Sequence, residues 1–502
     1  MTQSRTTTSA TCAAAGLVLF LALWQWAGKA AVAGPMLPAV SDVAVTLVAP
    51  ENFSLLMRSG LTTLASAAKG LVLGGSLAVL LAIVMRLLPP LQPGLDRLAL
   101  LVNATPPIAL GPILIVIFSR SQTPTVLAGV QVFFLLYVAA ASGMSAASRT
   151  LRDVITAFGA GRWKRLVHLE LPSALPHLAS GLKAAISASF IGAILGEWFG
   201  APQGLGLVIL NAMQNFQIRV MWAAVTMAAT MSLIGFLAAA IPGKSCGAKI
   251  QPAKFRPMKR FVANTWAVIL FLVAWSLWVR HSGLNGIVIV TPFAVARELM
   301  HNHSLYVQPA VHTIEVALFG MGGGLIFGLL LAIITWASRI LAGLTTPLAL
   351  LLTSVPVVCL IPVLTRIFGY DDRTVFVTVI ILCFLPGFVF ASAGLKALPP
   401  MAGEYFFVQG ADRWNRLTLL ALPAAVPSLA VALRVLSVQS VLSALIAEFL
   451  MQTGGLGFLI ATSTADLAMD QALAASVVTI FIALTFYLAA SLMERGILKY
   501  YN

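Results

Sequence analysis

The chain has 502 residues, of which 60% are hydrophobic and only 9% are charged, and its formal net charge is +15. Soluble domains carry about a quarter charged residues, so this composition excludes an ordinary soluble protein. Apolar runs of about 20 residues, long enough to cross a bilayer, recur along the whole chain. These features predict an all-α polytopic membrane protein. The four cysteines are scattered and predict neither a disulfide framework nor a metal site.

The N-terminal segment allows two interpretations. Arg5, the apolar stretch after it and the Ala31-Val32-Ala33 triplet resemble a cleaved signal peptide. The second half of the chain has a matching apolar helix in which Trp275 takes the place of Trp24, so we expect a retained first membrane helix. Six spans are predicted in the first half, near residues 12–33, 61–86, 97–118, 124–147, 177–199 and 219–241.

The second half repeats the first with an almost constant offset. Pro106 in the third span returns as Pro356, a shift of 250 residues, and Glu197 returns as Glu448, a shift of 251. A near-constant shift over about 100 residues indicates two homologous halves. Six further spans are predicted near residues 261–279, 311–335, 344–368, 373–395, 428–451 and 471–492.

Basic residues gather in short loops between the spans. This distribution is typical of cytoplasmic loops in membrane proteins, so the positive charge indicates topology and not nucleic-acid binding. Residues 242–260 hold six Lys or Arg and predict a flexible cytoplasmic linker between a first repeat, 1–241, and a second repeat, 261–502. With six spans in each half, both termini are expected in the cytoplasm and the halves are parallel repeats.

The loop after the fourth span of each half, residues 149–176 and 397–427, is polar and duplicated. Its glycine predicts a turn, and its proline predicts the end of the segment after that turn. Trp and Arg dominate protein–protein hot spots, so each loop is interpreted as a docking element for a cytosolic partner. A basic helix on anionic lipid would not require the shared spacing. The shared positions are Asp153, Gly159, Ala160, Arg162, Trp163, Leu171 and Pro172 in the first copy and Glu404, Gly410, Ala411, Arg413, Trp414, Leu422 and Pro423 in the second.

The spacing from each glycine to the Leu-Pro pair resembles the EAA loop of ABC-importer permeases. The resemblance is greatest to the nitrate, sulfonate and taurine group, and it includes both third spans and the Glu and Gly-Leu-Gly positions that close the fifth spans. Permeases of this group are usually single copies, so this chain resembles two copies fused. Both loops depart from the Glu-Ala-Ala opening, because Val154-Ile155 and Tyr405-Phe406 replace the alanines. We therefore expect two docking elements that are not equivalent.

The same resemblance implies partners and a mechanism. Two cytosolic ATPase subunits, which carry the ATP and Mg, would close and pull one loop each, and this movement would drive alternating access in the bacterial inner membrane. An extracytoplasmic binding protein would deliver the substrate, with one fused chain in each complex. A small anion such as nitrate, a sulfonate or taurine is the implied substrate. Heterocyclic vitamin precursors and aromatic carboxylates are alternatives.

The chain shows no catalytic motif of its own. Gly243-Lys244-Ser245 resembles part of a phosphate loop, but Ala238 stands where that loop needs a glycine. We expect no cofactor and no metal in this chain, and ATP hydrolysis in separate subunits. A proton-coupled secondary transporter with six plus six helices is the alternative, although that fold places its basic motif between the second and third spans. A non-transporting scaffold would have no use for a doubled docking loop.

Polar residues inside spans are candidates for the substrate path, because they are costly in the membrane. Lys69 would favour an anion there, unless its amine extends to the headgroups. The polar residues before the third-span prolines either bond freed backbone groups or contact substrate, and the two glutamines are expected mainly to bond between helices. The path candidates are Lys69, Asn103, Thr105, Gln131, Thr353, Ser354 and Gln439. Glu197 and Glu448, at equivalent ends of the fifth spans, are expected to anchor the outer gate.

Overall fold

The computed structural model describes residues 2–32, 34–239, 266–281, 290–338, 341, 345, 359–398 and 401–501. Every regular element in these ranges is helical, as the sequence predicts. The predicted linker at 242–260 lies outside the described residues, and so do the path candidates Thr353 and Ser354.

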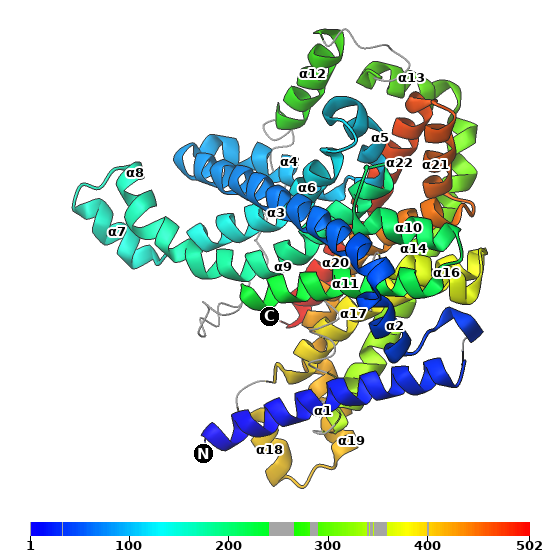
Figure 1. Cartoon of the computed structure of the whole chain (residues 1–502). Coiled ribbons are helices and arrows are strands. Elements are labelled where there is room, and N and C mark those ends of the chain that lie inside the picture. Colours follow the sequence, from blue (N-terminus) through cyan, green and yellow to red (C-terminus); the bar gives the residue numbers. More distant parts are fainter. Residues whose placement is uncertain are drawn as a thin grey trace.

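Helices of the first half alternate between long spans and short connecting segments (Figure 1). They are α1 (Thr2–Lys29), α2 (Val40–Val48), α3 (Pro50–Leu87), α4 (Gln92–Ala104), α5 (Pro107–Phe118), α6 (Thr123–Ser145), α7 (Arg149–Ala157), α8 (Arg162–Arg165), α9 (Leu171–Trp198), α10 (Leu205–Gln214) and α11 (Ile218–Ala238). A π-helical turn, Leu166–Glu170, joins α8 to α9.

The second half repeats this order over its described residues. Its helices are α12 (Trp266–His281), α13 (Pro292–His301), α14 (His303–Ala337), α16 (Leu360–Phe368), α17 (Asp372–Lys396), α18 (Ala402–Val408), α19 (Arg413–Arg416), α20 (Leu422–Met451), α21 (Leu456–Ala465) and α22 (Met469–Tyr501). A second π-helical turn, Leu417–Ala421, joins α19 to α20.

Within the part of the chain that the structure describes, eight of the twelve predicted spans correspond to helices that are long and apolar enough to cross a membrane. The described apolar parts of the two first spans, Ala14–Lys29 and Val268–His281, are shorter. Two further short apolar helices, α10 and α21, come after the fifth spans and were not predicted. The architecture is therefore the expected helical membrane protein, with additional short helices at one end of each half.

The third span of the first half was predicted as one helix, 97–118, and this prediction is wrong. The chain breaks between α4 and α5, where Thr105 and Pro106 have extended ψ angles of 122° and 124°. A residue that precedes a proline is disfavoured in the α conformation, and Thr105 and Pro106 both precede one. The Thr105 hydroxyl donates to the Leu101 carbonyl at 2.8 Å, so it satisfies a backbone carbonyl in the last turn of α4.

Each half is organised around a central helix that packs on two neighbours. Helix α6 packs against α3 and α9, and α17 packs against α14 and α20. Close approach of α3 and α6 depends on glycine, because a Cβ at Gly74 would lie 2.2 Å from the Gly129 carbonyl oxygen. Small residues allow such backbone contact between membrane helices. The largest buried apolar cluster joins the halves, since it contains Ile108 and Leu195 together with residues of α14, α17 and α20.

Replacing Gly74 with alanine is expected to destabilise the protein by about 1–3 kcal/mol, because the added methyl group has no space against the α6 backbone. The loss would be measured as a lower thermal midpoint in detergent. Gly322→Ala in α14 is the matched control, since a Cβ at that helical glycine would meet nothing within 4 Å. Equal midpoints for the two variants would contradict the close packing of α3 on α6.

Candidate functional site: two docking elements and two buried carboxylates

The duplicated loops form matching projections at the ends of the long helices. In the first, α7 is followed by a turn at Gly159 with φ +77°, and in the second, α18 is followed by a turn at Gly410 with φ +70°. Both turns were predicted from the glycines. Figure 1 shows α7 and α8 at one extremity of the molecule and α18 and α19 at another. The projections are therefore available to a partner outside the membrane helices.

Large side chains lie exposed at both tips. Trp163 is 62% exposed and Trp414 is 68% exposed, while Phe158 beside the first turn reaches 87%. Their exposure is compatible with the predicted docking role, which stays a prediction. The remaining predicted docking residues are arranged as follows: Asp153, Glu404, Arg162, Arg413, Gly159, Gly410 and Pro172 are exposed, and Ala160, Ala411, Leu171, Leu422 and Pro423 are half-buried.

The Leu-Pro pairs do not end the segments that come after the glycines, so this prediction is wrong. One continuous helix runs from Arg162 to Trp198, with Pro172 inside it. A proline has no N–H and its ring clashes with the carbonyl of the preceding turn. The π-helical turn Leu166–Glu170 directly before Pro172 widens the helix there, and so relieves the clash. The same arrangement precedes Pro423.

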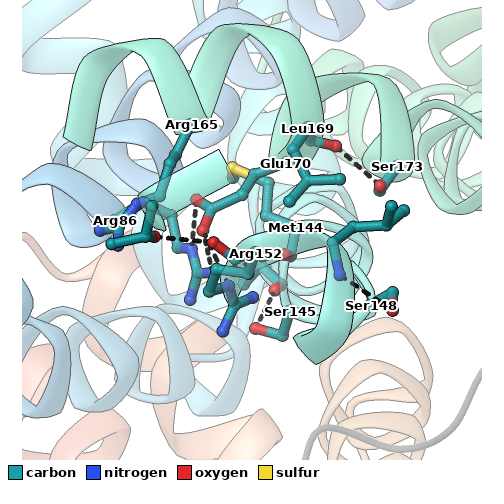
Figure 2. A network of polar contacts seen from close by, with 12 residues as sticks. Arg86, Met144, Ser145, Ser148, Arg152, Arg165, Leu169, Glu170 and Ser173 are labelled. Carbon is teal, nitrogen blue, oxygen red and sulfur yellow. Dashed lines mark hydrogen bonds and ion pairs between the residues drawn. The ribbon is translucent and has the colours of Figure 1, made fainter. Parts of the chain in front are cut away.

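A buried carboxylate fixes the base of the first docking element. Glu170, in the π-helical turn, is only 6% exposed. Its two oxygens accept hydrogen bonds from Arg86 at the end of α3, at 3.0 Å from Nε and 2.8 Å from an Nη atom (Figure 2). Arg152 of α7 lies 3.6 Å from the same carboxylate. Three elements, α3, α7 and the π-helical turn, therefore meet at one ionic cluster, defined here as the Glu170 cluster.

The second half has no counterpart of this cluster in its described residues. At the equivalent positions, with offsets of 250 or 251, Trp336 replaces Arg86, Ala421 replaces Glu170 and Gly403 replaces Arg152. Ala421 is fully buried in an apolar cluster against which Trp336 packs. At equivalent positions, the π-helical turn therefore contacts the preceding long helix through charged groups in the first half and through apolar groups in the second.

Glu197 is fully buried at the end of α9 and holds the start of α10. Its carboxylate accepts from the Thr63 hydroxyl at 2.7 Å and from the Gly206 backbone N–H at 2.6 Å. The Thr63 oxygen in turn accepts from the Leu205 N–H at 2.9 Å. Free N–H groups and the helix dipole favour a carboxylate at a helix N-terminus. We call this arrangement the first carboxylate clasp.

Glu448 forms the second carboxylate clasp at the start of α21. It accepts from the Thr313 hydroxyl at 2.9 Å and from the Gly457 N–H at 3.0 Å, and the Leu456 N–H donates to Thr313 at 2.9 Å. One difference is His312, whose Nδ1 lies 3.2 Å from Glu448. The two glutamates were predicted as structural anchors, and both hold a short helix in place; a gating role stays a prediction.

Arg366 of α16 connects the two halves at the C-terminal end of α10. Its guanidinium donates to the Met213 carbonyl at the end of α10 and lies 4.1 Å from the centre of the Phe216 ring. The helix dipole also stabilises a cation at the C-terminal end of a helix. The equivalent residue of the first half, at an offset of 250, is Val116, which has no charged group to make the same contact.

The described path candidates are dispersed among several helices. Lys69 is exposed on α3, on the same face as the exposed Val72 and Leu73. Asn103 and Gln131 are half-buried. Gln439 donates to Ser443 within its own helix, at 3.4 Å, whereas a bond between helices was expected. A contact of these residues with substrate stays a prediction.

Sequence reasoning missed the partners of the buried carboxylates. Thr63 and Thr313 differ by 250 residues, so the internal repeat was a signal that could have found them. Arg86 and Arg152 had no such signal, because their counterparts are not charged.

Comparisons with known proteins agree with the duplicated architecture. The family described as "Binding-protein-dependent transport system inner membrane component" matches twice, over residues 70–242 and 324–499, which together exceed half of the chain. No solved structure matches.

Each of three relatives matches little more than a third of this chain, 35–38%. A probable ABC transporter permease protein of Haemophilus influenzae is 28% identical over 180 residues, 36% of this chain and 74% of its own length. The formylaminopyrimidine transport permease protein ThiX of Halalkalibacterium halodurans is 30% identical over 177 residues, 35% of this chain and 71% of its own. The taurine transport system permease protein TauC of Escherichia coli is 26% identical over 189 residues, 38% of this chain and 68% of its own.

Proposed function

Because this chain belongs to the binding-protein-dependent transport system inner membrane component family, we propose that it forms both membrane halves of an ABC importer in one fused chain. The family is the membrane component of ABC transporters and is not itself an enzyme, since ATP hydrolysis belongs to separate subunits. The chain is accordingly a multi-pass inner-membrane permease.

The observation that carries the proposed coupling is the pair of exposed docking elements. Each presents a tryptophan that is more than 60% exposed, Trp163 or Trp414, beside an exposed arginine. Because the halves are duplicated, there is one element for each of two cytosolic ATPase subunits, which bind the ATP and Mg. With both basic elements in the cytoplasm, we expect both chain termini on that side as well. The clasps at Glu197 and Glu448 then face the outer side, where a binding protein delivers substrate.

The substrate is proposed as a small organic or inorganic anion of the sulfonate or taurine kind. Relatives named for aliphatic sulfonates and taurine support this class. Relatives named for formylaminopyrimidine and riboflavin support a heterocyclic vitamin precursor instead. The ligand that the cognate binding protein retains on purification would decide between them.

Reconstitution in liposomes tests the proposed function. With the ATPase subunits inside and the binding protein outside, uptake is expected to require ATP hydrolysis and to stop when the catalytic glutamate of the ATPase is replaced by glutamine. Collapse of the proton gradient is expected to leave uptake unchanged. Uptake that survives ATP depletion but not loss of the proton gradient would instead support the secondary transporter.

A further inference from the structure

We propose that Glu170 is a positioning residue that holds the first docking element in a fixed orientation, and that the second docking element lacks this constraint. This inference rests on the proposed function of the two elements. It concerns how firmly each element is joined to the membrane helices, and therefore how faithfully each transmits the movement of its ATPase.

The contact between Glu170 and Arg86 is directional. Two nitrogens of one guanidinium face the two carboxylate oxygens, at 3.0 and 2.8 Å, and such paired bonds fix the relative orientation of both groups. The same guanidinium approaches the Met144 carbonyl at 3.4 Å, so it also joins the end of α6. Arg86 therefore fixes the positions of three elements relative to one another: the end of α3, the end of α6 and the π-helical turn.

The first docking helix, α7, is attached to this cluster by Arg152, which lies 3.6 Å from Glu170. Arg162 of α8 donates to the Leu87 carbonyl at the end of α3, at 3.2 Å. Between α8 and α7, Arg165 donates to Thr156 at 3.4 Å. Figure 2 shows the side chains of Arg86 and Arg152 at the carboxylate of Glu170, with Arg165 to one side. Both parts of the first docking element are thus connected by polar contacts to the end of a membrane helix.

The second docking element is connected through apolar packing alone at the equivalent positions. Trp336 packs with the buried Ala421, and Gly403 provides no side chain toward this contact. Apolar contacts are non-directional, so they tolerate small rotations that a paired arginine–carboxylate contact does not. Hence α18 is expected to move more freely than α7.

Hydrogen exchange of the intact chain in nanodiscs tests this inference. Amides of α7 are expected to exchange about fivefold more slowly than those of α18, because α7 must break its ionic attachment to open. Arg152→Gln removes only the attachment of α7 and leaves the buried pair of Arg86 and Glu170, so the fold is retained. This variant, and Glu170→Gln, should raise α7 exchange to within about twofold of α18.

Gly403→Gln is the matched control, because it places the same side chain at the equivalent position without a carboxylate to meet. It should change α7 exchange in no measurable way. The inference fails if α7 and α18 exchange equally in the unmodified chain, or if Arg152→Gln leaves α7 exchange unaltered. Copurification of the ATPase subunits is scored separately. If they do not bind the unmodified chain, the proposed function fails, whereas the exchange measurements still decide the role of Glu170.

Discussion

Alanine at both Arg413 and Trp414 is expected to abolish most ATP-driven uptake while leaving the membrane helices folded. Trp414 is 68% exposed at the tip of the second docking element, so its loss removes contact area from a partner and not from the core. Central Trp and Arg residues of an interface each contribute about 2 kcal/mol or more, so either replacement alone should weaken ATPase binding by about 30-fold and the double variant by more than that. Copurification with the ATPase and uptake into liposomes measure the two effects.

The equivalent variant of the first half, with alanine at Arg162 and Trp163, gives the internal comparison. Arg162 also bonds to the Leu87 carbonyl, so its removal loosens the element from α3 as well as removing a contact residue. A larger effect on coupling is therefore expected for the first pair than for the second. Leu419→Ala controls for general surface damage, because Leu419 is 64% exposed on the same segment but lies beyond the tip. Normal ATPase binding and uptake in both double variants would refute the docking role.

The internal repeat made most of the architecture predictable. An offset of 250 or 251 residues paired the spans, the docking loops and the two glutamates, and each pairing corresponds to equivalent helices where both copies are described. The break in the third span follows a local rule, because Thr105 and Pro106 each precede a proline and therefore disfavour the α conformation. Helices α10 and α21 are ten residues each, too short to be recognised as spans.

The ionic and hydrogen-bonded partners were not predictable in the same way. Glu170 stands in the Leu-Glu-Leu-Pro stretch, but its partner Arg86 is 84 residues away on another helix. Only the packing of α3 and α6 against the π-helical turn brings the two charges together. For Pro172, a local rule gave the wrong prediction. Proline usually ends a helix, but the π-helical turn Leu166–Glu170 before Pro172 lets this helix continue.

The two carboxylate clasps differ in one partner, because Glu448 has His312 beside it, at 3.2 Å. Thr63→Val keeps the shape of the side chain but removes the hydroxyl that serves Glu197 and the Leu205 N–H. A buried polar group left without a partner costs about 1–3 kcal/mol, and this variant leaves two. We expect a lower thermal midpoint and faster hydrogen exchange at the start of α10, with slower uptake if α10 lines the outer gate.

Thr313→Val removes the same hydroxyl in the second clasp, yet Glu448 keeps the neighbouring His312 as a partner at 3.2 Å. Its effect on stability should therefore be the smaller of the two. Thr62→Val is the matched control, because the Thr62 hydroxyl bonds only to the Arg58 carbonyl one turn away, at 2.9 Å. If Thr62→Val and Thr63→Val lower the midpoint equally, the carboxylate contact contributes nothing specific. If Thr313→Val proves the more damaging, His312 does not stabilise the carboxylate, and the difference between the two clasps must then arise from the helices that surround them.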